Sequence, residues 1–171
     1  MNVLFVALEC APFVKTGGLA DVVGALPKAL AEAGVAVRTL LPCYPALAPV
    51  AAEGEVVLEN AGTSFGPMRI VAARAAGLDL LLLDAPHLFD RPGNPYMEGP
   101  GRDHPDNHLR FGALSYMGAL LAREGIEGFV PDVLHVHDWQ AGLAPAYVRL
   151  TAGRRVATVT TIHNIAFQGV F

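Results

Sequence analysis

Short segments of uninterrupted apolar residues constrain the fold of this chain more than any other feature. Residues 3–8 are apolar throughout and partly β-branched, which is typical of a strand buried on both faces of a parallel sheet. Similar strands are predicted over residues 35–41, 132–137 and 156–162. Parallel neighbours of this kind are joined by crossover connections, so helices are expected between them.

Three of the connecting segments have helical periodicity. Apolar residues recur every three or four positions over residues 19–33, 109–121 and 139–150. We expect Pro27 to kink the first of these helices and Gly34 to end it.

The middle of the chain follows a different pattern. Short β-like runs at residues 56–58, 69–71 and 80–83 are separated by glycines and predict a β-meander inserted between the helical crossovers. Residues 84–106 are rich in proline and glycine and predict a long loop, and loops of this length are usually functional or mobile. The predicted fold is therefore α/β, with a Rossmann-like, doubly wound, mostly parallel sheet and a β-meander insertion.

Charge and hydropathy exclude two classes of partner. Twelve basic residues against sixteen acidic ones give a net charge of −4, so the chain has no basic field for a nucleic acid. No apolar run approaches the roughly 18 residues that a membrane-spanning helix needs. Cys10 and Cys43 lack metal-ligand spacing and are interpreted as reduced thiols of a cytoplasmic protein. The residues before the first predicted strand, Met1 and Asn2, lack the features of a signal peptide, so export is not expected.

Ligands of doubly wound sheets bind outside the carboxyl ends of the strands, so polar residues directly after strands are the candidates for a site. Lys15, Thr16, Gly17 and Gly18 connect the first strand to the first helix. Glycine amides, the positive end of a helix and an ammonium group would converge there and suit a phosphate or pyrophosphate. A tight turn with a solvated lysine is the alternative. Neither the Walker spacing nor the dinucleotide-binding glycine pattern is present.

A second candidate lies at the end of the strand over residues 132–137. His135 and His137 alternate and share one face of that strand, and Asp138 follows. Asp138 could instead be only the N-cap of the next helix, and the histidines could be hydrogen-bonded structural residues. A metal site is the least favoured alternative because His104 and His108 lie elsewhere without diagnostic spacing.

Three further residues are candidates by position. His163 follows the last predicted strand, and its ring or carbonyl could meet a ligand hydroxyl or a developing positive charge. Glu9 ends the first strand and is either an exposed loop acid or an acceptor for sugar hydroxyls. Tyr96, in the proline-rich loop, is either a stacking platform for a sugar or a loop anchor.

Taken together and in order, these segments resemble the bacterial glycogen synthase and plant starch synthase family, the ADP-glucose-dependent α-1,4-glucan synthases. The resemblance spans the whole chain and is carried by residues 8–12, 15–27, 84–96, 135–145 and 161–169. It implies a GT-B glycosyltransferase, in which two Rossmann-like domains face each other across the active site.

The resemblance also implies roles for individual residues. Lys15, with Thr16 and Gly18, would meet the pyrophosphate of the donor, and Asp21 would support the loop or the ligand. The implied catalytic residues are Glu9, Asp138 and His163, and the implied substrate-binding residues are Lys15, Thr16, Gly17, Gly18, Asp21, Tyr96 and Asn164.

The implied reaction is retaining transfer of glucose from ADP-glucose to the non-reducing end of an α-1,4-glucan, with no metal and no cofactor. The departing phosphate and the backbone carbonyl of His163 would stabilise an oxocarbenium-like transition state, while cationic groups offset the charge that builds up on ADP.

We expect residues 1–171 to be a truncated N-terminal, acceptor-side domain without the nucleotide-binding domain, inactive or nearly so alone. Two alternatives are a related retaining GT-B enzyme that uses another sugar nucleotide and a non-catalytic glucan-binding module. The truncated edge of the predicted sheet invites pairing with another chain, so self-association is also expected.

Overall fold

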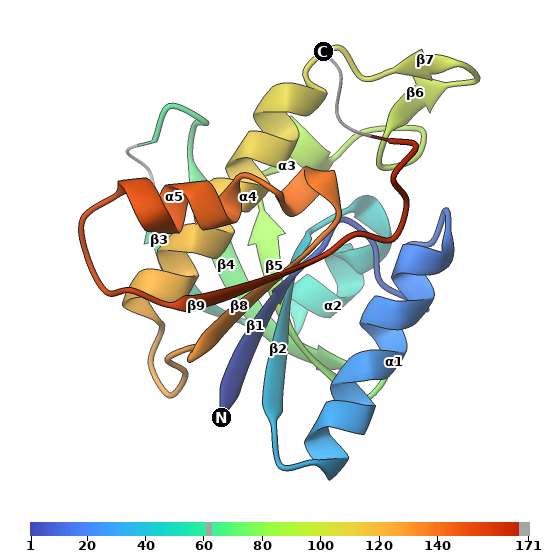
Figure 1. Cartoon of the computed structure of the whole chain (residues 1–171). Helices are drawn as coiled ribbons and strands as arrows, with labels where there is room; N and C mark the ends of the chain where they lie inside the picture. The colour runs from blue at the N-terminus through green and yellow to red at the C-terminus, as the bar shows by residue number, and fades with distance from the viewer. Residues whose placement is uncertain (61–62, 168–171) are drawn as a thin grey trace.

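One seven-stranded sheet organises the chain, with the strands in the order β3-β4-β5-β2-β1-β8-β9. Figure 1 shows a computed structural model, which describes residues 1–60 and 63–167. The strands of the sheet are β1 (Asn2–Val6), β2 (Ala36–Pro42), β3 (Glu55–Asn60), β4 (Met68–Ala75), β5 (Leu78–Asp84), β8 (Val133–His137) and β9 (Ala157–Thr161). The predicted Rossmann-like class, with a mostly parallel sheet, is confirmed.

The centre of the sheet is parallel and the meander extends one side of it. β1 pairs in parallel with both β2 and β8, and Val3 lies opposite Val37 and Val133. Leu4, which points to the other face, is also fully buried, as expected for a strand covered on both sides. The meander is antiparallel within itself, and its strand β5 joins β2 in parallel.

Helices cover both faces of the sheet. α1 (Gly18–Glu32) packs on Val3, Phe5 and Val37 through Leu26 and Leu30. On the opposite face, α4 (Asn107–Glu124) approaches β1 so closely that a Cβ added at Gly118 would lie 2.8 Å from the Val6 side chain. α5 (Ala144–Leu150) packs beside α4.

One helix prediction is confirmed in extent and one needs correction. α1 includes Pro27 within its span, and Gly34 (φ 76°) ends the segment as expected. The helix predicted over residues 139–150 is two pieces, the 3-10 turn η2 (Trp139–Ala141) and the short helix α5. Pro145, in the first turn of α5, lacks an N–H group, so it starts a helix there and cannot continue one.

The connection predicted as one long loop contains structure of its own. Residues 84–106 include the short helix α3 (Pro86–Phe89) and a small hairpin of β6 (Met97–Gly99) and β7 (Arg102–Asp103). A further turn and helix, η1 (Pro45–Leu47) and α2 (Ala48–Ala52), follow β2 and were not predicted. Proline lies at the start of both α2 and α3. The same residue type that indicated loops therefore also begins short helices.

A buried arginine fixes this proline-rich connection to α4. Arg110 is 1% exposed and donates hydrogen bonds to the carbonyls of Leu88 (2.8 Å) and Pro95 (2.9 Å) and to Oδ1 of Asn107 (2.6 Å). Asn107 in turn donates through Nδ2 to the carbonyl of Tyr96 (2.9 Å). The segment that carries Tyr96 is therefore anchored on the core, although its sequence is typical of a mobile loop.

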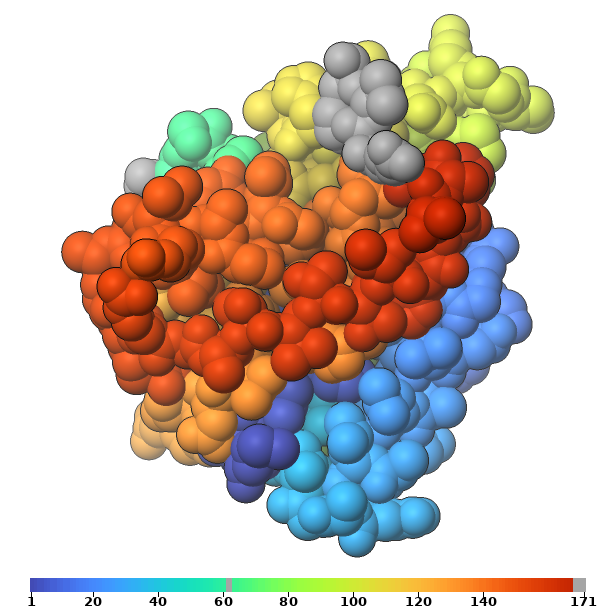
Figure 2. All heavy atoms as spheres, viewed as in Figure 1, coloured from blue at the N-terminus to red at the C-terminus, as the bar shows by residue number. Residues whose placement is uncertain are grey.

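The edge of the sheet at β9 is exposed. All of β9 is exposed except Thr161, which is half-buried, and Val159 is 45% exposed. Figure 2 shows β9 running across the front of the molecule below α5, with no other element over it. Within residues 1–60 and 63–167, no helix has the length and apolar character needed to cross a membrane.

Candidate active site

Adjacent parallel strands bring three loops to the same edge of the sheet. β1, β8 and β9 are neighbours, and their carboxyl ends lead into residues 7–17, 138–143 and 162–167. The predicted site residues lie in these loops, in the first turn of α1, or in the proline-rich connection at Tyr96. The topology therefore gathers segments that are more than 100 residues apart in the sequence.

Glu9 is buried beneath the loop that carries Lys15, and is not an exposed acid. Its exposure is 1%, and its carboxylate accepts hydrogen bonds from the backbone N–H groups of Thr16 and Gly17 (3.4 Å from Gly17) and from the Thr16 hydroxyl (2.8 Å). Amides just before a helix lack intrahelical acceptors, and a negative charge is favourable there. Glu9 therefore shapes the loop at the start of α1.

Tyr96 joins the same network from the proline-rich connection. Its hydroxyl donates to Oε1 of Glu9 (2.5 Å) and accepts from Nε2 of Gln140 (3.2 Å). Burial, reinforced by the hydrogen bond to Glu9, raises the pKa of Tyr96, so the phenol stays protonated and remains a donor. The Tyr96 hydroxyl therefore anchors the proline-rich connection to Glu9 and Gln140.

Gln140 is a site residue that the sequence reasoning missed. It is 4% exposed, lies in η2 and links that turn to Tyr96 and Glu9. Its position two residues after Asp138, at the end of a predicted strand, was the signal that could have identified it.

Lys15 is held beside the first turn of α1 by Asp21. The Lys15 ammonium lies 2.7 and 2.8 Å from the two carboxylate oxygens of Asp21, and both side chains are about half exposed (52% and 56%). Cβ atoms added at Gly17 or Gly18 would meet nothing within 4 Å, so the space in front of the helix is open. Lys15, Asp21 and the two glycines thus form one exposed, polar helix start.

Asp138 does not cap the helix that follows it. No side-chain cap is present at η2; instead Oδ1 of Asp138 accepts hydrogen bonds from the backbone N–H groups of His163 (2.6 Å) and Asn164 (3.4 Å). The N-cap alternative is wrong. The backbone of Asp138 adopts φ 59° and ψ −175°, a conformation that residues other than glycine rarely adopt. Asp138 therefore connects the loops after β8 and β9.

Three histidine rings stack beside this connection. The rings of His135 and His137, which were predicted to share a face, are stacked with their centroids 4.3 Å apart. The rings of His137 and His163 are also stacked, with their centroids 5.3 Å apart. Nδ1 of His137 is 3.0 Å from Nε2 of His163, and Nε2 of His135 is 2.7 Å from the Thr161 hydroxyl. Burial, with the neighbouring His135 and His163 rings, lowers the pKa of His137 to about 3, so this ring is neutral at pH 7.

The described part of the chain contains no cluster of three or more His, Cys, Asp or Glu side chains arranged to hold a metal ion. His104, which the metal alternative considered, is buried and its Nε2 lies 3.1 Å from the carbonyl of Asn94.

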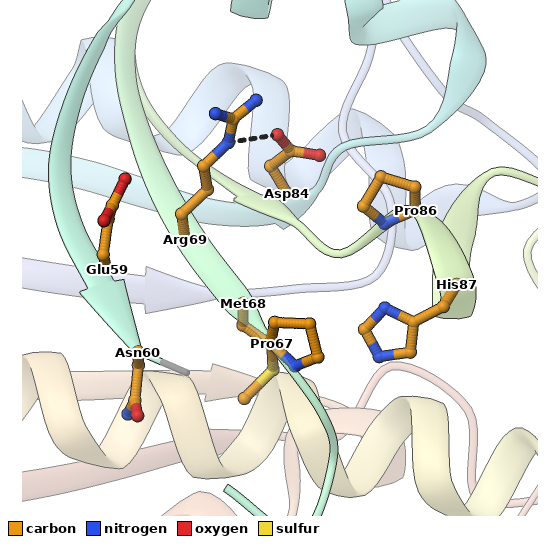
Figure 3. Close-up of a pocket in the computed structure, with 8 residues that line it drawn as sticks. All are labelled: Glu59, Asn60, Pro67, Met68, Arg69, Asp84, Pro86 and His87. Carbon is orange, nitrogen blue, oxygen red and sulfur yellow. Dashed lines mark hydrogen bonds and ion pairs between the residues drawn. The ribbon is translucent and has the colours of Figure 1, made fainter. Parts of the chain in front are cut away.

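A separate pocket of about 370 Å³ lies beside β3, β4 and β5 (Figure 3). Its lining includes Asp84, His87 and Arg69, and the Asp84 carboxylate is paired with Nε of Arg69 at 2.6 Å. None of the predicted site residues lines it, so the Asp84–His87 segment of the proline-rich connection belongs to a different surface from the site.

The fold and the site define a class of protein. A mostly parallel, doubly wound sheet with polar loops at the carboxyl ends of its central strands is the architecture of the Rossmann-like domains from which GT-B glycosyltransferases are built. The chain belongs to the family described as the starch synthase catalytic domain, whose sequence model matches residues 2–171.

Individual relatives agree with this assignment. The chain is 58% identical over 171 residues to a glycogen synthase of Roseobacter denitrificans, covering all of this chain and 36% of that protein. It is 56% identical over 169 residues to a glycogen synthase of Paracoccus denitrificans, covering 99% of this chain and 36% of that protein.

A solved structure has the same fold. The catalytic domain of starch synthase IV from Arabidopsis thaliana, bound to ADP and acarbose, superposes with a TM-score of 0.76 at 29% identity, covering 97% of this chain and 34% of that chain. The chain thus spans about a third of the length of the relatives it matches.

Proposed function

We propose that this chain forms the acceptor-side part of a glycogen synthase active site, in which glucose is transferred with retention from ADP-glucose to the non-reducing end of an α-1,4-glucan. The observation that supports this most directly is that the loop after β1 and the loops after β8 and β9 lie at the same edge of the sheet. The first carries Lys15 beside the open start of α1. In the other two, Asp138 accepts a hydrogen bond from the backbone N–H of His163. A relative of the same fold is bound to ADP and acarbose.

The helix start suits the diphosphate of the donor. Gly17 and Gly18 leave the first turn of α1 open, and the Lys15 ammonium lies next to it. Helix N-termini and ammonium groups both favour phosphate oxygens, so together they would offset the charge on the leaving ADP. Asp21 keeps Lys15 in place, and Thr16 is fixed by Glu9.

The second loop system suits the sugar. Asp138 holds the backbone of His163 and Asn164, so the carbonyl of His163 has a fixed position from which it could stabilise positive charge at the sugar. Glu9 and Tyr96 are hydrogen-bonded to each other beneath the loop that carries Lys15. We therefore propose that they position this loop and do not contact the reacting atoms.

The test uses a chimaera in which this chain replaces the matching 36% of the Roseobacter denitrificans glycogen synthase. Lys15→Ala should weaken the binding of ADP-glucose by about 2 to 4 kcal/mol, because a charge-assisted phosphate contact is lost. Lys28→Ala, which removes the chain's other lysine, located on α1, is the matched control. Equal donor binding in both variants would contradict the proposal and favour a glucan-binding module.

We further propose that the isolated chain self-associates through β9. The exposed edge of a parallel sheet presents unpaired backbone groups, and Val159 and Ile162 add exposed apolar area beside it (45% and 65% exposed). Sedimentation equilibrium should detect dimers or larger species. A clean monomer at high concentration would contradict this.

The free thiols of Cys10 and Cys43 support a cytoplasmic location, because two cysteines left unpaired are typical of reducing compartments.

A further inference from the structure

His137 is a buried residue to which the proposed function gives no role. It is fully buried at the end of β8, and its ring lies between those of His135 and His163. Nδ1 is 3.0 Å from Nε2 of His163, and the other nitrogen, Nε2, is buried with no partner among the described residues. Each nitrogen of this ring therefore has a different environment.

The hydrogen bond between the two rings needs one proton, and burial decides where it lies. If His163 donated, neutral His137 would carry its own proton on Nε2, leaving a buried N–H group without an acceptor. If His137 donates from Nδ1, only an acceptor is left unpaired, which is the more common situation in proteins. His137 therefore donates to His163, and a neutral His163 keeps its proton on Nδ1.

His163 is thus held at two points by consecutive residues of one strand end. Its backbone N–H donates to Oδ1 of Asp138 at 2.6 Å, and its ring nitrogen Nε2 accepts from His137. The backbone carbonyl and the Nδ1–H group of His163 remain, and within the described ranges neither has a partner. These are the two groups of His163 that a sugar could contact.

We propose that His137 is a positioning residue, which fixes the ring orientation and tautomer of His163 through the hydrogen bond between the two rings. This inference rests on the proposed function of the site, in which the carbonyl of His163 stabilises positive charge at the sugar. The bond between the rings is a second restraint on residue 163, in addition to the hydrogen bond from its backbone N–H to Asp138. A misplacement of about 1 Å in an active site can lower a rate on the order of 10²-fold.

Substitutions at residue 137 in the chimaera test the catalytic part. His137→Leu removes the donor and should lower kcat by roughly 10- to 100-fold, while KM for ADP-glucose changes by no more than about 2-fold. His137→Asn keeps an N–H donor at the position of Nδ1 and should recover most of kcat. His135→Leu is the matched control, because it removes a ring from the same stack without touching His163, and should leave kcat within about 2-fold.

Nitrogen NMR of the 171-residue chain tests the tautomer without any activity. His163 should show the Nδ1–H form in the wild type and in His137→Asn, and a mixture of both forms in His137→Leu. The proposal is overturned if His163 is Nε2–H in the wild type, if its tautomer is the same in all three chains, or if His137→Leu leaves kcat unchanged in an active chimaera. An inactive chimaera with the expected tautomers would overturn the proposed function instead.

Discussion

Glu9 is a buried carboxylate whose partners are hydrogen-bond donors from two loops: Thr16, Gly17 and Tyr96. Glu9→Gln replaces one acceptor oxygen by an NH₂ group that faces those donors. We expect a loss of about 1 to 3 kcal/mol in the free energy of unfolding and weaker donor binding in the chimaera. Denaturant unfolding measures the first effect and KM for ADP-glucose the second.

Tyr96→Phe gives the comparison for that substitution. It removes one donor to Glu9 and the acceptor of Nε2 of Gln140, and it leaves the Thr16 hydroxyl on the same carboxylate oxygen. Its cost should be smaller than that of Glu9→Gln, which affects all three residues that donate to Glu9. If Tyr96→Phe destabilised the chain more than Glu9→Gln, Glu9 would not be the centre of the network.

The buried imidazole of His137 makes stability depend on pH. The pKa of His137 is about 3 in the folded chain, whereas an unfolded histidine titrates near ~6.5. The unfolded chain therefore binds the proton first, and stability falls as the pH drops from about 6.5 towards 3, by at most about 1.4 kcal/mol per pH unit for one proton.

His137→Phe should make the free energy of unfolding less dependent on pH, by the equivalent of up to one proton taken up on unfolding. Denaturant unfolding at several pH values measures this. His135, whose pKa burial also lowers, supplies part of what remains. An unchanged slope in His137→Phe would show that His137 is not buried neutral.

At the scale of elements, two glycines of α1 have different roles: Gly18 borders the proposed diphosphate position, and Gly24 lets the helix pack closely on the loop after β1. A Cβ added at Gly18 meets nothing, whereas one added at Gly24 would lie 2.5 Å from the carbonyl oxygen of Ala11. Gly24→Ala should push α1 off the loop after β1 and lower the free energy of unfolding by about 1 to 3 kcal/mol. Gly18→Ala should leave stability intact but raise KM for ADP-glucose in the chimaera, because the methyl group enters the open space. The reverse pattern would contradict the proposed diphosphate position.

Arg110 should control the order of the proline-rich connection. Arg110→Met leaves the carbonyls of Leu88 and Pro95 without their donor, at about 1 to 3 kcal/mol for each buried group. We expect faster hydrogen exchange over residues 88–106. Arg102→Met, at an exposed arginine on β7, is the control and should change little. Equal exchange in both variants would mean that Arg110 does not hold the connection.

The strands and the parallel centre of the sheet could be predicted because a strand buried on both faces is apolar at every position, as residues 3–8 are. Less of the site could be predicted. The Glu9 carboxylate accepts a hydrogen bond from Tyr96, which is 87 residues away in a segment that Arg110 helps to anchor. Asp138 looked like an N-cap because local spacing does not reveal a partner in the loop after β9.

At the scale of the whole molecule, one side of a cleft should not suffice for transfer. The chain spans about a third of the length of the relatives it matches, and the proposed charge stabilisation requires groups around the whole donor. We expect the 171-residue chain to transfer no glucose from ADP-glucose to glycogen, in an assay in which the chimaera is active. Transfer by the chain alone would refute its assignment as a partial site.

At Asp138, thermal stability and catalytic turnover favour different residues. Its positive φ costs about 1 to 3 kcal/mol in any residue but glycine, yet only its carboxylate holds the backbone of His163 and Asn164. Directed evolution of the chimaera for survival at high temperature alone should therefore enrich glycine at position 138, and a second round selected for glucan yield should bring aspartate back.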